Sequence, residues 1–167
     1  KNLSTLVNAA TGTYNTSHYK LTAPVILGSD WTPIGNTTAK AFKGTFNGDG
    51  KTITFSLSVY EIESADLNKP YGLFGANSGT IQNLGVAGSF EITSNNRVSC
   101  FGSIAGENQK NGVITDCFSS CDVSLTNLDD NSVIVGGIVG QNMGMLENSY
   151  AVGDVTATAT TGSYVRA

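Results

Sequence analysis

A pattern of glycine and asparagine that recurs three times is the feature that most constrains the fold of this chain. Gly75, Gly106 and Gly140 each precede an asparagine by two residues, and they are spaced 31 and then 34 residues apart. The pattern extends over residues 71–92, 100–126 and 135–158. Repeats of this length are typical of solenoids, because one repeat cannot bury its own apolar face and must stack on the next.

The three copies also align at positions outside the glycines. In a parallel stack, we expect equivalent residues to lie next to one another at the spacing of neighbouring strands, about 4.8 Å. The aligned sets are Ile81, Ile114 and Leu146; Phe90, Val123 and Val155; Asn77, Asn108 and Asn142; and Asn83, Asp116 and Asn148. The two apolar sets are predicted to be interior ladders, and the Asn77 set is predicted to be a third ladder. Asn or Asp at a corner tolerates the left-handed backbone that a sharp bend needs.

The spacing of apolar residues within a copy predicts short strands. Around Ile114 the apolar residues are interrupted every few positions by Gly, Asn, Asp or Ser, which is strand and turn spacing rather than helical spacing. The sequence therefore predicts an all-β parallel solenoid.

The repeat resembles a known family. Gly-Leu-Phe-Gly at 72–75 and Gly-Gly-Ile-Val-Gly at 136–140 are similar to the GLUG repeat of bacterial surface proteins, and the segment from Tyr19 to Ile53 resembles the stretch that often precedes those repeats. The resemblance extends from about Leu3 to Val155, and the middle copy departs from it with Ser103, a longer turn and Cys121 in place of glycine. It implies a right-handed parallel β-helix within large secreted or surface-attached adhesin-like proteins, some of whose relatives are parts of secreted proteases.

The chain is predicted to be one domain over residues 1–167, with a cap and leader at 1–30 and a leader coil at 31–60. Leu3, Leu6, Val7 and Ala10 recur at helical spacing, so we expect a short helix that covers the open end of the stack. Residues 20–27 alternate loosely and predict one strand, with Pro24 at an edge or bend.

Two motifs in the leader each have two interpretations. Trp31 is a candidate ligand-binding residue because an exposed indole can stack on a sugar, but packing over the first coil beside Ile34 is the simpler interpretation. Residues 46–50 contain Asn-Gly and Asp-Gly, which predict a tight turn between strands. A calcium site at Asn47 and Asp49 would need further oxygen ligands.

Two charged stretches are predicted to be loops that display binding residues. Residues 61–70 form the most charged stretch and include the candidate Asp66, and residues 127–131 contain the candidates Asp129 and Asp130. Insertions on one face of a solenoid often carry binding. The two carboxylates at 129 and 130 could hold calcium, and a solvated loop is the simpler interpretation.

The cysteines are Cys100, Cys117 and Cys121. Cys117 aligns with Leu84 and Ser149, so we expect a buried thiol there. Cys100 and Cys121 are a candidate disulfide in an oxidising compartment, although the sequence does not provide their geometry. A metal site is not predicted, because no histidine accompanies the cysteines and their spacing is not that of a zinc site.

The composition excludes two classes of partner. The net charge is −4 and the nine Lys and Arg residues are scattered, so non-specific nucleic-acid binding is not expected. No apolar run approaches the ~18 residues of a membrane helix, so no membrane span is expected. The chain begins at Lys1 without a signal peptide and ends in what resembles the approach to another repeat. We therefore expect a piece of a longer precursor that is extracellular or at the bacterial cell surface.

Catalytic motifs are missing from the sequence. His18 is its only histidine, and no zinc-protease, serine-elbow or phosphate-loop motif is present. Asp122 and Asp154 are the best candidate carboxylate pair for a glycosidase, but their third equivalent is Ser89 and turn chemistry is the simpler interpretation. We predict a protein without catalytic activity and without a cofactor.

Three classes of function remain. The leading hypothesis is a structural and adhesive segment of a surface protein that presents loops or a face to a host or community glycan or matrix protein. The alternatives are a polysaccharide-active β-helix module and a non-catalytic spacer of a large secreted protease. An open C-terminal strand edge would also permit self-association.

Overall fold

The computed structural model describes residues 2–9, 13–56, 58–62, 69–94, 100–127, 132–159 and 164–166. Within these ranges the chain is almost entirely β-structure, with one short α-helix and one 3-10 helix near the N-terminus. The elements are α1 (Asn2–Asn8), β1 (His18–Lys20), β2 (Val25–Leu27), η1 (Thr38–Lys40), β3 (Thr45–Phe55), β4 (Ser58–Ile62), β5 (Phe74–Asn77), β6 (Thr80–Ser94), β7 (Cys100–Gly102), β8 (Ala105–Asn108), β9 (Val113–Thr115), β10 (Phe118–Asn127), β11 (Ser132–Gly136), β12 (Val139–Asn142), β13 (Met145–Glu147), β14 (Tyr150–Ala151), β15 (Val155–Ala159) and β16 (Tyr164–Arg166).

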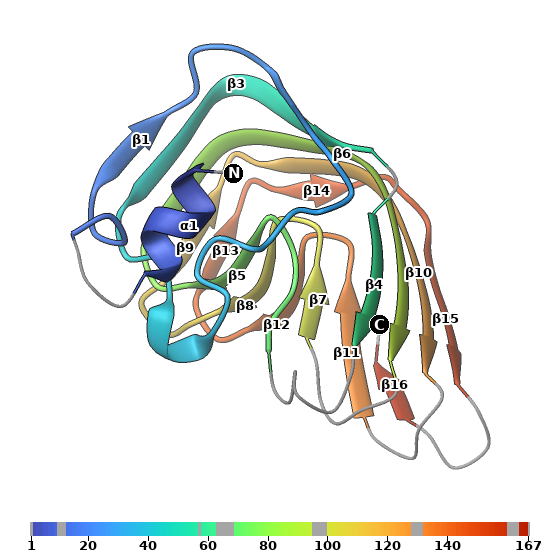
Figure 1. The fold of residues 1–167 in the computed structure, drawn as a ribbon. Coiled ribbons are helices and arrows are strands. Elements are labelled where there is room, and N and C mark those ends of the chain that lie inside the picture. The colour runs from blue at the N-terminus through green and yellow to red at the C-terminus, as the bar shows by residue number, and fades with distance from the viewer. Residues whose placement is uncertain are drawn as a thin grey trace.

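The strands of the described residues form three sheets. A ten-stranded sheet has the main order β1-β3-β6-β10-β14, and two three-stranded sheets have the orders β16-β11-β7 and β12-β8-β5. All strand pairs in the described ranges are parallel, and each repeat returns to the same three sheets (Figure 1). The large sheet curls around the two small ones, so the all-β prediction is confirmed with a curled parallel sheet (Figure 1).

The observed register confirms the aligned sets. Ile114 pairs with Ile81 on one side and with Leu146 on the other. The other sets pair in the same way: Val123 with Phe90 and Val155, and Asn108 with Asn77 and Asn142. Ile81 and Ile114 are fully buried, whereas Leu146 is 39% exposed because it belongs to the last repeat.

Strand β10 illustrates why these short segments become strands. Its side chains alternate between the interior and the solvent, with Cys121, Val123 and Leu125 buried and Asp122 and Ser124 exposed. This period of two fits a sheet with one face toward a core. The interior contains fully buried phenylalanines, and the rings of Phe90 and Phe101 lie 4.9 Å apart, so side chains from different sheets meet in the core.

The buried asparagines form a ladder of side-chain amides. Asn77 and Asn108 are fully buried, and Asn77 Nδ2 donates to Asn108 Oδ1 at 2.9 Å. Asn108 Nδ2 donates to Asn142 Oδ1, also at 2.9 Å. Burying an amide is unfavourable unless it is hydrogen-bonded, so these bonds require the three repeats to remain in register.

Helix α1 confirms the predicted N-terminal helix, and it lies against the segment 32–36 that precedes β5 in the stack (Figure 1). Its contacts are more polar than the apolar spacing predicted. Asn8 Oδ1 accepts hydrogen bonds from the backbone N–H of Gly35 and Asn36, and Ser4 Oγ donates to Thr32 O at 2.6 Å. Of the predicted apolar face, Val7 is buried but Leu6 is 39% exposed. None of the described helices has the length and apolarity needed to span a membrane.

Two predictions for the leader are wrong. Residues 20–27 are not one strand, since β1 ends at Lys20 and β2 begins at Val25, with Pro24 in the break. Residues 46–50 do not reverse the chain. They lie inside β3, where positive φ angles at Asp49 (53°) and Gly50 (71°) produce a bulge after which pairing with β6 resumes.

Two loop boundaries also need correction. Glu61 and Ile62 belong to β4 rather than to a loop. Asn127, which was assigned to a loop at 127–131, is fully buried at the end of β10. In both cases the strand extends further than the local charge and turn residues predict, because pairing with β6 continues to Ser94.

The substitution Ile114→Asp is expected to unfold the protein. It would place an unpaired carboxylate at a position with no solvent exposure, at a cost above about 4 kcal/mol. Leu146→Asp is the matched control, because the same change at the half-exposed end of the same ladder should cost about 1 kcal/mol or less. Urea denaturation would measure both, and equal losses would contradict the proposed arrangement of the ladder.

Candidate functional site

Four left-handed residues are stacked at one corner of the fold. Asp49, Asn83, Asp116 and Asn148 have φ angles of 53°, 52°, 53° and 47°. The last three are the set that the sequence placed at a corner, and Asp49 adds a member from the bulge of β3. Aspartate and asparagine tolerate this conformation better than other non-glycine residues, which explains why this column is polar.

The corner residues are oriented by local hydrogen bonds. Asn47 Oδ1 accepts from the backbone N–H of Asp49 at 2.8 Å and from Asn83 Nδ2 at 3.4 Å, so one side chain links two strands of the corner. Asp116 Oδ2 accepts from Thr115 Oγ at 3.0 Å. The polar groups of the column are therefore fixed in position but remain on the outside of the sheet.

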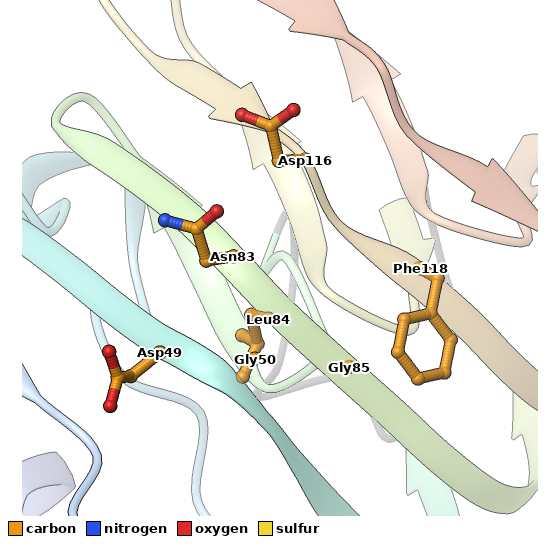
Figure 2. A pocket seen from close by; sticks show the side chains of 7 residues that line it. All are labelled: Asp49, Gly50, Asn83, Leu84, Gly85, Asp116 and Phe118. Atoms are coloured by element: carbon orange, nitrogen blue, oxygen red, sulfur yellow. The ribbon is translucent and has the colours of Figure 1, made fainter.

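A shallow depression of about 350 Å³ lies beside this column. We call it the corner groove, and its lining residues are Asp49, Gly50, Asn83, Leu84, Gly85, Asp116 and Phe118. Figure 2 shows Asp49, Asn83 and Asp116 following one another across adjacent strands, with the ring of Phe118 on the other side of the groove. The groove thus has one polar wall and one aromatic wall.

The aromatic wall exists because equivalent positions on adjacent strands carry side chains of different size. Gly85 pairs with Phe118, which pairs with Tyr150. A Cβ on Gly85 would lie 2.5 Å from Phe118 Cζ, so the ring leans over the space that glycine leaves. Phe118 and Tyr150 are stacked, with centroids 5.9 Å apart and an interplanar angle of 18°, and Tyr150 is 59% exposed. We call this pair the aromatic step.

Lysines balance the charge at one end of the corner groove. The carboxylate of Asp49 forms ion pairs with Lys51 at 2.7 Å and with Lys20 at 3.0 Å. Hydrogen bonds from Lys51 and then Lys20 lower the pKa of Asp49, so it is ionised at neutral pH. The carboxylates of Asp49 and Asp116 can accept hydrogen bonds from hydroxyl groups, and Asn83 can both donate and accept.

Trp31 does not lie on the surface, contrary to its prediction as a ligand-binding residue. Its side chain is 7% exposed, and Nε1–H donates to Leu73 O at 3.3 Å. It contributes to the wall of a small depression beside Tyr71 and Pro70, but its ring is part of the core. The reason is that Trp31 and Ile34 fill the first layer of the stack, as the simpler interpretation held.

The other predicted ligand-binding residues, Asp66, Asp129 and Asp130, lie outside the described residues. The predicted carboxylate pair is described: Asp122 Oδ1 accepts from the backbone N–H of Asp154 at 3.0 Å. This bond gives one of the two carboxylates a structural role between adjacent repeats. Both line a second shallow depression with Glu91. Among the residues that the structure describes, no His, Cys, Asp and Glu side chains form a group suited to hold a metal ion.

The predicted Cys100–Cys121 disulfide is not formed, and Cys100, Cys117 and Cys121 are free, buried thiols. The two cysteines belong to different sheets, because Cys100 begins β7 and Cys121 lies within β10. Cys100 Sγ donates to Gln141 Oε1 at 3.3 Å instead. Cys117 is buried in the position of Leu84, as predicted.

Sequence reasoning missed the aromatic step, although the signal was present. Phe118 and Tyr150 each follow a left-handed corner residue by two positions, and the equivalent residue in the first repeat is Gly85. Aromatic residues that recur two positions after the corner residue in successive repeats, in a row that also contains Thr52 and Gly85, indicate a surface feature rather than core packing.

Comparison with known proteins identifies the repeat. Residues 131–156 match the family model of the GLUG motif. Halomucin from Haloquadratum walsbyi is 36% identical over 115 residues, which are 68% of this chain and 1% of that protein. The chain therefore spans about 1% of the length of this relative. The predicted resemblance to GLUG repeats is confirmed.

A solved structure is also similar to this chain. A protein from Bacteroides ovatus, provisionally assigned as an immunoglobulin A1 protease, matches with a TM-score of 0.36 and 15% identity. The match covers 91% of this chain and 77% of that chain. A TM-score this low supports no conclusion about fold or function.

The buried thiols are expected to be unreactive in the folded protein. Burial raises the pKa of each thiol from its usual value of 9.0 to about 11, so all three are protonated at pH 8. A thiol reagent at pH 8 should label none of them before denaturation and all of them afterwards. Because the folded state holds these protons more tightly, the free energy of unfolding should fall as pH rises from about 9 to about 11. Rapid labelling of the native protein at pH 8 would contradict this burial.

Proposed function

We propose that this GLUG-motif chain is an adhesive segment of a secreted or cell-surface protein and that it binds extracellular glycans at the corner groove. The GLUG motif and the similarity to halomucin support an extracellular or surface location. The observation that carries the binding proposal is the corner groove itself, in which stacked polar residues face the aromatic step across Gly85.

The proposed architecture is a right-handed parallel β-helix. It is supported by strand pairing that is parallel throughout the described residues and by the return of each repeat to the same three sheets. Right-handedness follows from the general preference of parallel crossover connections. Such a rod is stiff and presents equivalent outward positions in straight rows, which suits the display of a repeated binding feature.

Glycan chemistry matches the two walls of the corner groove. A sugar ring has an apolar face of C–H groups that packs on an aromatic ring, and a rim of hydroxyls that bond to carboxylates and amides. Phe118 lines the groove and stacks on the more exposed ring of Tyr150, and Asp116 and Asn83 offer the polar groups. Successive repeats lie about 4.8 Å apart, comparable to one sugar unit of an extended chain, so a polymer running along the stack would meet one repeat per sugar.

The charges of the corner groove favour neutral or amino-sugar polymers. Lys20 and Lys51 are already paired with Asp49, whereas Asp116 is hydrogen-bonded to a hydroxyl and faces no lysine among the described ion pairs. A sulfate or uronate near Asp116 would be repelled, and an ammonium group would be attracted.

Binding to a panel of neutral, amino-sugar and anionic polysaccharides tests this proposal. Tyr150→Ala should weaken binding to the retained glycan about tenfold or more, because it removes an exposed ring from the aromatic step. Tyr14→Ala is the matched control, since Tyr14 is an exposed tyrosine (43%) outside the aromatic step, whereas Tyr150 stacks on the groove-lining ring of Phe118. Folding of both variants is checked by melting temperature.

Two results would contradict the proposal. One is the absence of retention on every glycan by the folded protein, and the other is an equal loss of binding in Tyr150→Ala and Tyr14→Ala. The same experiment tests the prediction that the protein is not an enzyme. Cleavage of a polysaccharide would overturn that prediction and direct attention to Asp122 and Asp154. The spacer and polysaccharide-active hypotheses stay as alternatives.

A further inference from the structure

A second depression lies between the leader coil and the first repeat, and it shares no lining residue with the corner groove. Its volume is about 220 Å³, and we call it the leader pocket. Residues 31–36 form one wall, and residues 69–71 form the other. Helix α1 is bonded to the first wall, and Tyr71 of the second wall pairs with Phe101 of the next repeat. The leader pocket therefore lies within the stack and not at one of its ends.

The repeat glycine Gly75 brings the two walls of the leader pocket together. A Cβ on Gly75 would lie 2.9 Å from Pro70 O on one wall and 3.1 Å from Asn36 Cα on the other. Both backbones can approach this closely only because glycine has no side chain. The first wall is also fixed to the helix, since Asn36 N–H donates to Asn8 Oδ1 at 3.0 Å. The stack thus forms the pocket before any ligand arrives.

The lining of the leader pocket combines apolar ring edges with a few polar groups. Trp31 and Tyr71 are 7% and 8% exposed, so only the edges of their rings reach the pocket. Two buried prolines, Pro33 and Pro70, complete the apolar part. Sites for drug-sized molecules are larger, at about 300 Å³ or more. A pocket of this size therefore suits one small chemical group of a ligand.

Asn36 has the feature that indicates a ligand. Among the residues that the structure describes, its Oδ1 is the one buried side-chain oxygen or nitrogen without a hydrogen-bond partner. Such an atom is unfavourable, and buried acceptors are normally paired with the protein or with water. The hydrogen bond that the structure describes for Asn36 involves its backbone, so no described bond holds the amide in place. The terminal torsion of asparagine is broad, so Oδ1 can turn toward a donor in the pocket.

We propose that the leader pocket binds the acetamido group of an N-acetylated amino sugar. This group carries a donor, an acceptor and a methyl group within a small volume. Its N–H donates to Asn36 Oδ1, and its carbonyl accepts from the ammonium group of Lys69, which has three donors. Its methyl group packs on the edges of Trp31 and Tyr71, which differs from a sugar stacked on an exposed indole.

An acetamido group also occurs in acetylated peptides. The GLUG motif and the similarity to halomucin support an extracellular or surface location, where N-acetylated sugars are common components of polymers. The location therefore favours the sugar over the peptide. The inference does not depend on binding at the corner groove, because the two sites are lined by different residues.

Three small probes test the assignment by nuclear magnetic resonance titration of the intact chain. They are the methyl glycosides of N-acetylglucosamine and of glucose, and N-acetylalanine methylamide. The N-acetylglucosamine glycoside should shift the signals of the Trp31 indole N–H and the Asn36 side-chain amide. It should bind about tenfold or more tightly than the glucoside, which lacks the methyl group and the amide. The peptide-like amide should bind more weakly than the N-acetylated sugar.

Variants of Asn36 test its role. Asn36→Leu should keep or raise the melting temperature, because it replaces an unpaired acceptor with an apolar group of similar size, and it should lose the tenfold preference. Asn36→Asp retains an acceptor of the same shape and should retain the preference. Asn111→Leu is the matched control, since Asn111 is exposed and lines neither site. Tyr150→Ala should also retain the preference, which separates the leader pocket from the corner groove.

Four results would overturn the proposal. If the N-acetylated glycoside shifts neither signal, the unpaired oxygen is served by water alone. If Asn36→Leu lowers the melting temperature, Asn36 has a structural role. Loss of the preference in Tyr150→Ala would place the acetamido group at the corner groove. Equal or tighter binding of N-acetylalanine methylamide would assign the pocket to a peptide.

Discussion

The rest of the structure depends on the hydrogen bonds between stacked asparagine side chains. Asn77 and Asn108 have no solvent exposure, so their amides must find partners inside the protein. Each finds one in the next repeat at 2.9 Å, and this is possible only when the repeats are parallel and in register. The apolar ladder of Ile81 and Ile114 is satisfied by the same register, so polar and apolar requirements select one arrangement.

The surface of the protein follows from that interior register. Once the repeats are aligned, the left-handed residues Asp49, Asn83 and Asp116 form a column, and the column forms one wall of the corner groove. The opposite wall arises because Gly85 leaves space for the ring of Phe118 in an outward row that also contains Thr52 and Tyr150. The proposed binding site needs no loop, since outward positions on stacked strands are arranged by the core.

The repeat made much of the fold predictable and little of the site. Equivalent residues in a repeat experience equivalent neighbours, so the ladders and the left-handed corner could be located from spacing alone. Local signals failed where stacking overrides them: Asn-Gly and Asp-Gly at 47–50 predicted a turn, yet β3 continues because β6 pairs on both sides of the bulge.

Trp31 was ambiguous because the sequence does not show which side of a layer faces the core. The separation of Cys100 and Cys121 depends on the assignment of strands to different sheets, which spacing does not provide.

The exchange of side-chain amide protons with solvent, followed by nuclear magnetic resonance, tests the central claim most directly. The account predicts strong protection of the Asn77 and Asn108 Nδ2 protons, because both are buried and bonded to the next repeat. The Asn142 Nδ2 protons should exchange rapidly, since they have no partner among the described residues. Rapid exchange at Asn108, equal to that at Asn142, would contradict an amide ladder that holds the repeats in register.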